Sequence, residues 1–403
     1  MTEILKPASD TQLRDVVAWA VAEETPLEIV AHGSKRGFGR PVQARHTLDV
    51  SALTGIRSYE PEELVLTCAA ATPMAEIRAA LDAKRQMLAF EPADLAPLYS
   101  ARDGAGTIGG VLSAGLGGPR RVKSGSARDH LLGFHAVSGR GEIFKAGSKV
   151  VKNVTGYDLP KIFCGAFGTL GVMTEVTVKV LPAPPKSRTV LLLGLDEAAA
   201  TTAMADALNS PFEISGAALL PASIAARSQI DYVRDAGASV TALRIEGTPA
   251  SVEARCRDLR ALLAGRAPDQ ELHSMRSVRL WAELRDIDSL LPDRATAIWR
   301  LSVPPASMPS VAALVQGERF YDWGGGLIWL ATRGDGDADA ARVRGAIAAS
   351  GGHATLLRAS EPVRAGIPVF QPQDSGIAAL TRRVKESFDP KRVLNPGRLY
   401  AGV

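Results

Sequence analysis

The stretch Thr107–Arg121, TIGGVLSAGLGGPRR, contains five glycines in fifteen positions and almost no residue suited to act as an acid, base or nucleophile. Glycine alone lets a main-chain N–H group approach a large or charged ligand without a Cβ in the way. A flexible turn is the other interpretation of any single glycine-rich run. The stretch therefore indicates either a ligand-binding loop or a turn.

Two more glycine-rich segments accompany the full run GAGTIGGVLSAGLGG at 104–118, namely AHGSKRGFG at 31–39 and CGAFGTLG at 164–171. None fits the dinucleotide fingerprint of Rossmann domains, because no G-x-G-x-x-G opens a helix directly after a first strand. None carries the Lys-Ser/Thr pair of a Walker A loop, which argues against nucleotide hydrolysis. Three such loops predict one extended ligand that is contacted at several places.

Composition excludes several classes of protein. The 403 residues are enough for two or three domains, and a net charge of +4 does not mark a nucleic-acid-binding protein. Cys68, Cys164 and Cys256 lie far apart without C-x-x-C spacing, so neither an iron–sulfur cluster nor a zinc site is predicted. The polar start and the lack of a long apolar run argue against secretion and against a membrane span. We expect a cytoplasmic location, or attachment to the inner membrane only through partners.

The pattern of apolar residues changes near PAPPKSR, residues 182–188, which is the best candidate linker. Before it, the periodicity predicts a helix over 9–24, a hairpin over 131–147 and an edge or half-buried strand over 172–182. After it, strand and helix patterns alternate, which is typical of an α/β layer domain with helices on one face of an antiparallel or mixed sheet. No internal repeat is detected.

Two long motifs resemble the FAD-binding domain of the vanillyl-alcohol oxidase/p-cresol methylhydroxylase (VAO/PCMH) fold. They are GAGTIGGVLSAGLGGPRRVKSGSARDHLLG at 104–133 and VVKNVTGYDLPKIFCGAFGTLGVMTEVTVKVLP at 150–182. The resemblance covers residues 1–183, and FDPKRVLNPGR at 388–398 looks like the closing motif of that superfamily. Several long motifs in the right order are more specific than a single glycine loop.

Within that superfamily, the chain is similar to the FAD-binding subunit of bacterial glycolate oxidase, in HGSKRGFGRP, QMLAFEP and KNVTGYDLPK. The fold class that the resemblance implies is α+β. It consists of a two-subdomain PCMH-type FAD-binding domain at 1–183, a smaller ferredoxin-like α/β cap domain at 184–375, and a C-terminal segment at 376–403 that packs on the FAD domain.

The same resemblance implies FAD contacts along several strips of the chain. The first strip wraps the pyrophosphate, the next ones run beside the flavin and ribityl, and the last ones reach the nucleotide half. The residues implied are Ala31, His32, Gly33, Ser34, Lys35, Arg36, Glu91, Pro92, Thr107, Ile108, Gly109, Gly110, Ser113, Ala114, Ser126, Asp129, Gly168, Gly171 and Val172. Leu170 and Val172 fit equally well as core residues.

The histidines favour a non-covalent cofactor and give no metal site. Some members of the superfamily attach flavin through a loop histidine, but His32 precedes Gly33 and does not follow a Gly-Gly pair. The 2-hydroxy-acid dehydrogenases of this fold carry a segment Gly-His-x-Gly-x-Gly-Asn-x-His that holds a metal and the proton acceptor. The nearest counterpart here, YDWGGGLIWL at 321–330, lacks both histidines. No catalytic residue is therefore assigned.

The resemblance implies an FAD-binding subunit of a multi-subunit glycolate oxidase, which converts glycolate to glyoxylate. This chain would bind FAD and relay electrons or scaffold two partners, a catalytic sister flavoprotein and an iron–sulfur subunit. One alternative is a self-sufficient FAD-dependent 2-hydroxy-acid dehydrogenase that uses Tyr157, Lys152 or an arginine of the second domain. Another is a structural module without flavin.

Overall fold

The computed structural model describes residues 3–99, 106–148, 157–291 and 293–403. The chain forms two compact units, which we call unit 1 and unit 2. Unit 1 contains residues 1–117, 126–183 and 372–403, and unit 2 contains residues 118–125 and 184–371. The division predicted from sequence therefore differs from the compact units at 118–125, which pack within unit 2, and at 372–375, which pack within unit 1.

Unit 1 begins with a small parallel sheet. Its order is β1-β3-β2, with β1 at Glu3–Leu5, β3 at His46–Asp49 and β2 at Leu27–Val30. Helix α1 (Asp10–Ala22) begins after Ser9, whose side chain accepts a hydrogen bond from the amide of Gln12. Its buried residues pack against Leu27 and Leu48. This sheet fixes the start of the first glycine-rich loop, which follows β2 directly.

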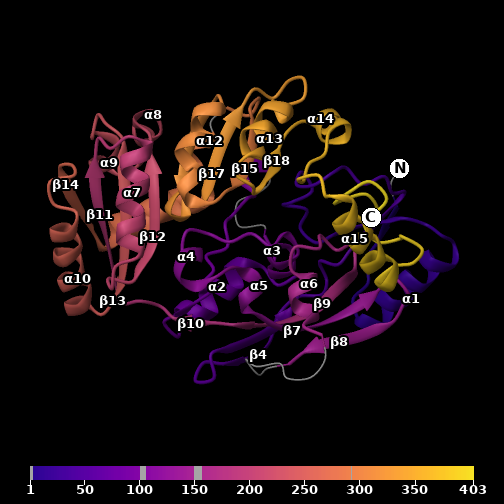
Figure 1. The fold of residues 1–403 in the computed structure, drawn as a ribbon. Coiled ribbons are helices and arrows are strands. Elements are labelled where there is room, and N and C mark those ends of the chain that lie inside the picture. Colours follow the sequence, from indigo (N-terminus) through magenta and orange to yellow (C-terminus); the bar gives the residue numbers. More distant parts are fainter. Residues whose placement is uncertain (1–2, 100–105, 149–156, 292) are drawn as a thin grey trace. The chain divides into compact units, whose positions relative to one another are not determined.

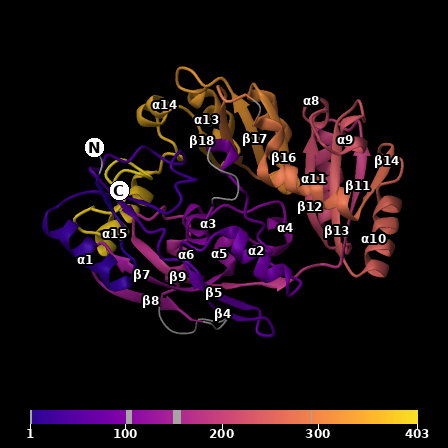
Figure 2. The ribbon, with the colours of Figure 1, turned by 180° about the vertical axis from the view of Figure 1, so that it is seen from behind.

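A five-stranded antiparallel sheet forms the larger part of unit 1. Its order is β4 (Ile56–Glu60), β5 (Val65–Ala69), β9 (Gly171–Lys179), β7 (Leu131–Ser138) and β8 (Ile143–Gly147). Apolar residues of four helices cover one face of it, as Figure 2 shows: α2 (Met74–Asp82), α3 (Ile108–Ala114), α5 (Ala127–His130) and α6 (Leu159–Phe163). A strand is present where one was predicted over 172–182, but β9 lies in the middle of the sheet and is largely buried, so the expectation of an edge or half-buried strand is wrong.

The C-terminal segment belongs to unit 1. Helix α15 (Ser375–Phe388) places Phe388 against the rings of Phe144 and Phe163. After the helix, Leu394 forms a parallel bridge with Leu27 of β2. The chain end therefore returns to the strand that leads into the first glycine-rich loop.

Unit 2 holds an eight-stranded antiparallel sheet built from two successive β-α-β-β-α-β motifs (Figure 1). The first motif comprises β11 (Lys186–Leu193), α7 (Glu197–Leu208), β12 (Ile214–Leu220), β13 (Val240–Gly247), α10 (Pro249–Leu262) and β14 (Asp269–His273). The second comprises β15 (Ala297–Ser302), α12 (Met308–Leu314), β16 (Glu318–Asp322), β17 (Leu327–Thr332), α13 (Ala340–Ala348) and β18 (His353–Arg358). In each half the third strand lies between the first and the second, and the fourth strand lies on the outer side of the first. This is the ferredoxin-like arrangement.

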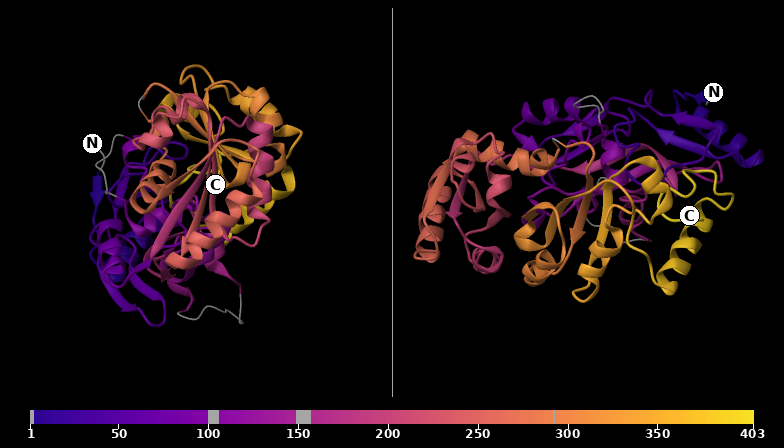
Figure 3. Two further views of the ribbon diagram at one scale, coloured as in Figure 1. Left: turned by 90° about the vertical axis from the view of Figure 1, so that its left-hand side faces the viewer. Right: turned by 90° about the horizontal axis from the view of Figure 1, so that it is seen from above.

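The two halves join edge to edge, where Leu219 of β12 pairs with Tyr321 of β16. The structure thus contains an internal duplication that sequence analysis did not detect. The order of elements repeats, whereas the residues do not repeat visibly in the sequence. The right-hand view of Figure 3 shows the second half, in orange, beside the first half. Helix α11 (Ser274–Asp286), between the halves, was also missed, and β11 already begins at Lys186 inside the predicted linker.

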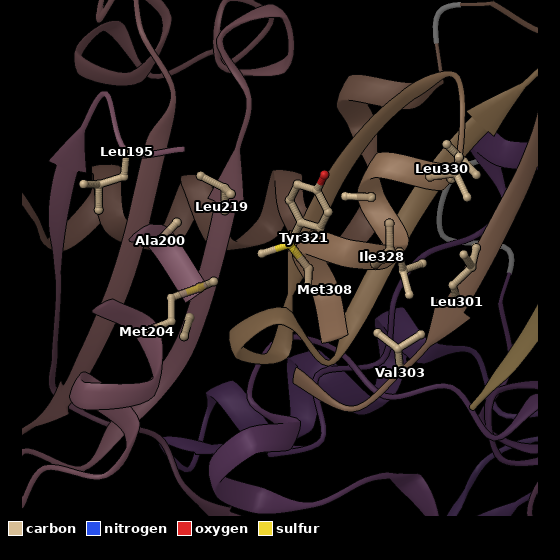
Figure 4. Packing of buried hydrophobic residues seen from close by; sticks show 14 of the residues in the cluster. Leu195, Ala200, Met204, Leu219, Leu301, Val303, Met308, Tyr321, Ile328 and Leu330 are labelled. Carbon is tan, nitrogen blue, oxygen red and sulfur yellow. The ribbon is translucent and has the colours of Figure 1, made fainter. Parts of the chain in front are cut away.

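One continuous apolar core covers one face of this sheet. Helices α7, α10, α12 and α13 contribute to it, and Figure 4 shows its side chains running from Leu195 in the first half to Leu330 in the second. Alternate residues of a strand point to opposite faces. On β15, Trp299 and Leu301 belong to this core, so Arg300 between them lies on the other face.

Candidate functional site

The three glycine-rich segments of unit 1 meet at one pocket of about 140 Å³. Twelve of the residues implied by the sequence line it: Ala31, Gly33, Ser34, Lys35, Arg36, Gly109, Gly110, Ser113, Ala114, Gly168, Gly171 and Val172. Segments that lie more than 130 residues apart in the chain, counted from Ala31 to Gly168, thus converge on one site. A set of unrelated flexible turns would not do this, so the convergence favours the ligand-binding interpretation.

The loop after β2 presents backbone donors and one ammonium group. Gly33 has a φ of +71°, and the amide of Arg36 donates to the carbonyl of Gly33. Within the described residues, the amides of Gly33, Ser34 and Lys35 have no backbone acceptor. A row of such amides is a concave site for an anion.

Lys35 brings its charge to the second segment. A Cβ added at Gly106 would lie 3.3 Å from Nζ of Lys35, and one at Gly110 would lie 3.9 Å from it. Burial lowers the pKa of Lys35 below the usual lysine value, and the charge of Asp94 opposes that shift only in part. A ligand anion beside Nζ would raise the pKa of Lys35 again, because it stabilises the charged form.

Helix α3 begins close to the backbone of its neighbours. Thr107 is its N-cap, and the Thr107 hydroxyl accepts a hydrogen bond from the amide of Gly110 at 3.2 Å. The amide of Gly109 donates to the carbonyl of Ala70 at 2.7 Å, and a Cβ at Gly109 would lie 2.7 Å from that same oxygen. Glycine at 109 therefore allows a close approach that no other residue permits.

Asn395 connects the third segment with the first. Its Nδ2 donates to the carbonyl of Phe167 at 2.8 Å, and its Oδ1 accepts from the amide of Ile29 at 2.8 Å. Arg398 then donates to the carbonyls of Lys35 and Arg36 at 2.9 and 3.0 Å. Sequence analysis missed the positions of both residues at the pocket, although the motif at 388–398 was the available signal.

The seven other implied residues do not line the pocket: His32, Glu91, Pro92, Thr107, Ile108, Ser126 and Asp129. Several have structural roles instead. Ile108 is fully buried in the core, and Ser126 and Asp129 cap α5, with the amide and hydroxyl of Ser126 donating to Asp129 at 2.8 and 2.9 Å. Their contacts to a cofactor stay predictions.

The segment 321–330 of unit 2 comprises the end of β16, a tight turn at 323–326 and the first part of β17. The carboxylate of Asp322 accepts a hydrogen bond from the amide of Trp323 at 2.7 Å, and Gly324 and Gly325 both have positive φ. No histidine lies in this turn, as its sequence already indicated. Of the bases considered for the self-sufficient alternative, Tyr157 is 89% exposed and Lys152 lies outside the described residues.

Comparison with known proteins adds independent findings. A family model described as FAD binding domain matches residues 2–147. Glycolate oxidase subunit GlcE of Escherichia coli (strain K12) is 35% identical over 390 residues, which are 96% of this chain and 97% of that protein. Glycolate oxidase subunit GlcD of Bacillus subtilis (strain 168) is 38% identical over 120 residues, 29% of this chain and 24% of that protein.

A crystal structure of p-cresol methylhydroxylase with substrate bound superimposes with a TM-score of 0.70 at 15% identity, covering 98% of this chain and 88% of that one. The predicted PCMH-type fold class is thereby confirmed, and so is an FAD-binding domain in the N-terminal part of the chain. No helix of the described residues has the length and apolar character that a bilayer span requires.

Proposed function

Because the chain belongs to the family of glycolate oxidase subunit GlcE, we propose that it binds FAD as one subunit of a multi-subunit oxidase that converts glycolate to glyoxylate. The observation that carries this proposal is the convergence of three glycine-rich segments on one pocket of unit 1. A dinucleotide with two phosphates and a flat ring system is the kind of ligand that such a pocket suits.

The residues present fit FAD. The amides of Gly33–Lys35 and the ammonium of Lys35 suit the diphosphate, since they supply donors and one positive charge. Gly109 and Gly110 have no side chains, so at these two positions the backbone itself lines the pocket. We propose that the cofactor is held without a covalent bond, since the exposed His32 does not line the pocket. Bound FAD supplies a two-electron acceptor.

We infer the roles of the oxidase subunits from the residues that unit 2 of this chain contains. Oxidation of a 2-hydroxy acid needs a group that accepts the hydroxyl proton. The segment 321–330 lacks both histidines that the 2-hydroxy-acid dehydrogenases of this fold carry, and Trp323 and Trp329 lie nearby instead. We therefore assign hydride abstraction to a sister flavoprotein similar to GlcD and onward electron transfer to an iron–sulfur subunit, with this chain relaying electrons or scaffolding the assembly.

Reconstitution tests the proposal. The tagged full chain is purified, its FAD content is measured after extraction, and proteins that copurify with it are identified by mass spectrometry. Turnover of glycolate and D-lactate is then compared between the isolated FAD-loaded chain and the chain combined with the sister flavoprotein and the iron–sulfur subunit. We expect a yellow protein with turnover only in the combination, in the cytoplasmic fraction or on the inner membrane through its partners.

Two results would exclude the proposal. Appreciable turnover by the isolated chain would establish the self-sufficient dehydrogenase instead. A colourless preparation that does not take up added FAD would leave only the structural module.

A further inference from the structure

The turn that carries the third glycine-rich segment to the pocket contains a residue with an unfavourable backbone conformation. The amide of Thr169 donates to the carbonyl of Ala166 at 3.0 Å and closes the turn, and the Thr169 hydroxyl donates to the same oxygen at 2.7 Å. The two central residues, Phe167 and Gly168, have φ values of +53° and +71°. Positive φ at both central positions is the pattern of a type I′ turn, which favours glycine, asparagine and aspartate. A bulky side chain such as that of Phe167 is an outlier there.

Hydrogen bonds on both sides hold the backbone of Phe167 in this conformation. Its amide donates to the carbonyl of Ser113, in the last turn of α3, at 3.0 Å, and its carbonyl accepts the hydrogen bond from Asn395. The main chain makes both bonds, so glycine at this position would form them equally well and without strain. The turn itself therefore gives no reason for a phenylalanine. Residues that their surroundings hold in a strained conformation cluster at ligand-binding sites.

The ring of Phe167 lies where the first and the third glycine-rich segments meet. Its centre is 4.8 Å from the ring centre of Phe38, and the two ring planes are nearly perpendicular, at 84°. Phe38 is only 2% exposed, whereas Phe167 is half-buried and lines the pocket. Edge-to-face contact is a favoured geometry of aromatic pairs. The buried Phe38 therefore helps to hold the ring of Phe167 at the pocket.

Among the described residues that line the pocket, Phe167 is the only aromatic one. The donors of the first loop suit the diphosphate, but they provide no surface for a flat ring. Aliphatic side chains such as those of Val50 and Val172 also line the pocket. Only an aromatic side chain can stack on a flat heterocycle or meet it edge to face.

We propose that the ring of Phe167 contacts a flat ring of FAD and thereby determines how tightly the pocket holds the cofactor. This inference rests on the proposed function, because it takes FAD as the ligand of the pocket. Adenine and isoalloxazine are both flat heteroaromatic rings, so the same contact chemistry suits either end of FAD. The ring contacts, with Phe38 in the free chain and also with FAD in the bound one, offset the unfavourable backbone of the turn.

Fluorescence titration of the full chain with FAD tests the inference in three variants. Phe167→Gly removes the ring and suits the left-handed backbone, so we expect FAD to bind about tenfold or more weakly, while the urea midpoint of the FAD-free chain stays near that of the wild type. Phe167→Asn should behave in the same way and covers the case in which Phe167→Gly does not fold, because asparagine tolerates positive φ. Phe167→Tyr keeps an aromatic ring and should bind FAD nearly as tightly as the wild type.

Leu64→Gly is the matched control. Leu64 is also an apolar, half-buried residue of unit 1 with a left-handed backbone, at a φ of +57°, but it is not one of the residues that line the pocket. Its replacement by glycine relieves the same kind of backbone strain away from the pocket. The affinity for FAD should therefore stay at the wild-type value.

Competition of ADP and of FMN with FAD distinguishes the two flat rings. Weaker binding of ADP alone in Phe167→Gly would assign the contact to adenine, and weaker binding of FMN alone would assign it to isoalloxazine. Equal weakening of both would indicate a general loss of the pocket and overturn the inference, as would wild-type affinity for FAD in Phe167→Gly or Phe167→Asn. These results leave the proposed function intact as long as the wild type binds FAD. A wild type that does not bind FAD would refute the proposed function, and this inference with it.

Discussion

The ammonium of Lys385 donates to the carboxylate of Asp389 at 2.7 Å, and both side chains are almost completely buried. The same Nζ donates to the carbonyls of Thr169 and Leu394, at 2.7 and 2.9 Å. Asp389 in turn accepts from the amides of Val393 and Leu394. This buried pair ties α15, the third glycine-rich segment and the C-terminal tail together, and it thereby fixes one wall of the pocket.

Replacement of Lys385 by methionine should destabilise the chain and impair FAD retention. The change leaves the buried carboxylate of Asp389 without its counter-ion, which costs about 3–5 kcal/mol of the free energy of unfolding. Urea denaturation and the flavin absorbance of the purified variant measure the two effects. The control is Lys391→Met, since Lys391 pairs with Glu24 at the surface and should matter little. Equal stability of the two variants would contradict the role of the buried pair.

Replacement of Gly109 by valine should abolish FAD retention, and alanine should weaken it. A side chain there must displace the carbonyl of Ala70, which lies 2.7 Å from the position of the new Cβ. Gly345→Ala is the control: this glycine lies in α13 with no atom within 4 Å of the added Cβ, so helix propensity favours alanine by about 0.5–1 kcal/mol. FAD extracted per chain is measured for all three variants. A full FAD content in Gly109→Val would refute the assignment of this segment.

Unit 2 should lose stability in acid through Glu246. Its carboxylate accepts two hydrogen bonds from Arg120, each of 2.9 Å. Burial raises the pKa of Glu246, but Arg244 and Arg120 outweigh burial and lower the pKa from 4.5 to about 2. The pair therefore stabilises the folded state fully above pH 4.5, and this contribution is lost as the pH falls from 4.5 towards 2.

Arg120→Met tests this pair in unit 2. We expect a free energy of unfolding that is lower by about 2 kcal/mol or more near neutral pH, because the buried Glu246 then loses both hydrogen bonds from Arg120. Urea denaturation over an acidic pH series should also show a weaker pH dependence in Glu246→Gln than in the wild type. An unchanged pH dependence in Glu246→Gln would show that other groups control acid stability.

The sequence allowed the glycine-rich segments to be predicted as parts of one site, because glycine itself marks a special backbone position. Gly33 has a positive φ, and Gly109 approaches the carbonyl of Ala70 too closely for a side chain. The Lys385–Asp389 pair could not be predicted. A Lys and an Asp four residues apart on a helix usually form a solvated surface pair, and only tertiary packing buries this one. The contacts of Asn395 and Arg398 likewise join positions separated by more than 200 residues.

Neither the burial of Arg300 nor the internal symmetry of unit 2 could be predicted from the sequence. A charged residue in the run AIWRLS is expected to be exposed, yet the pleat of β15 places Arg300 on a covered sheet face. The two ferredoxin-like halves are related by the order of their elements and by the pairing of Leu219 with Tyr321. Such a relationship depends on strand order, which the local pattern of residues does not encode.

The affinity for FAD should fall at alkaline pH because of Lys35. Burial lowers the pKa of this ammonium in the free chain, and a bound diphosphate raises it again by stabilising the charged form. At a pH above the lowered pKa, Lys35 must take up a proton when FAD binds, so the affinity declines before the usual lysine range is reached.

Lys35→Met should bind FAD about tenfold or more weakly, and its affinity should not change over the same pH range. Arg36→Met is the control, because Arg36 pairs with Glu28 and should leave the pH dependence intact. Fluorescence titration of FAD from neutral to alkaline pH measures all three proteins; an alkaline decline that persists in Lys35→Met would show that another group binds the diphosphate.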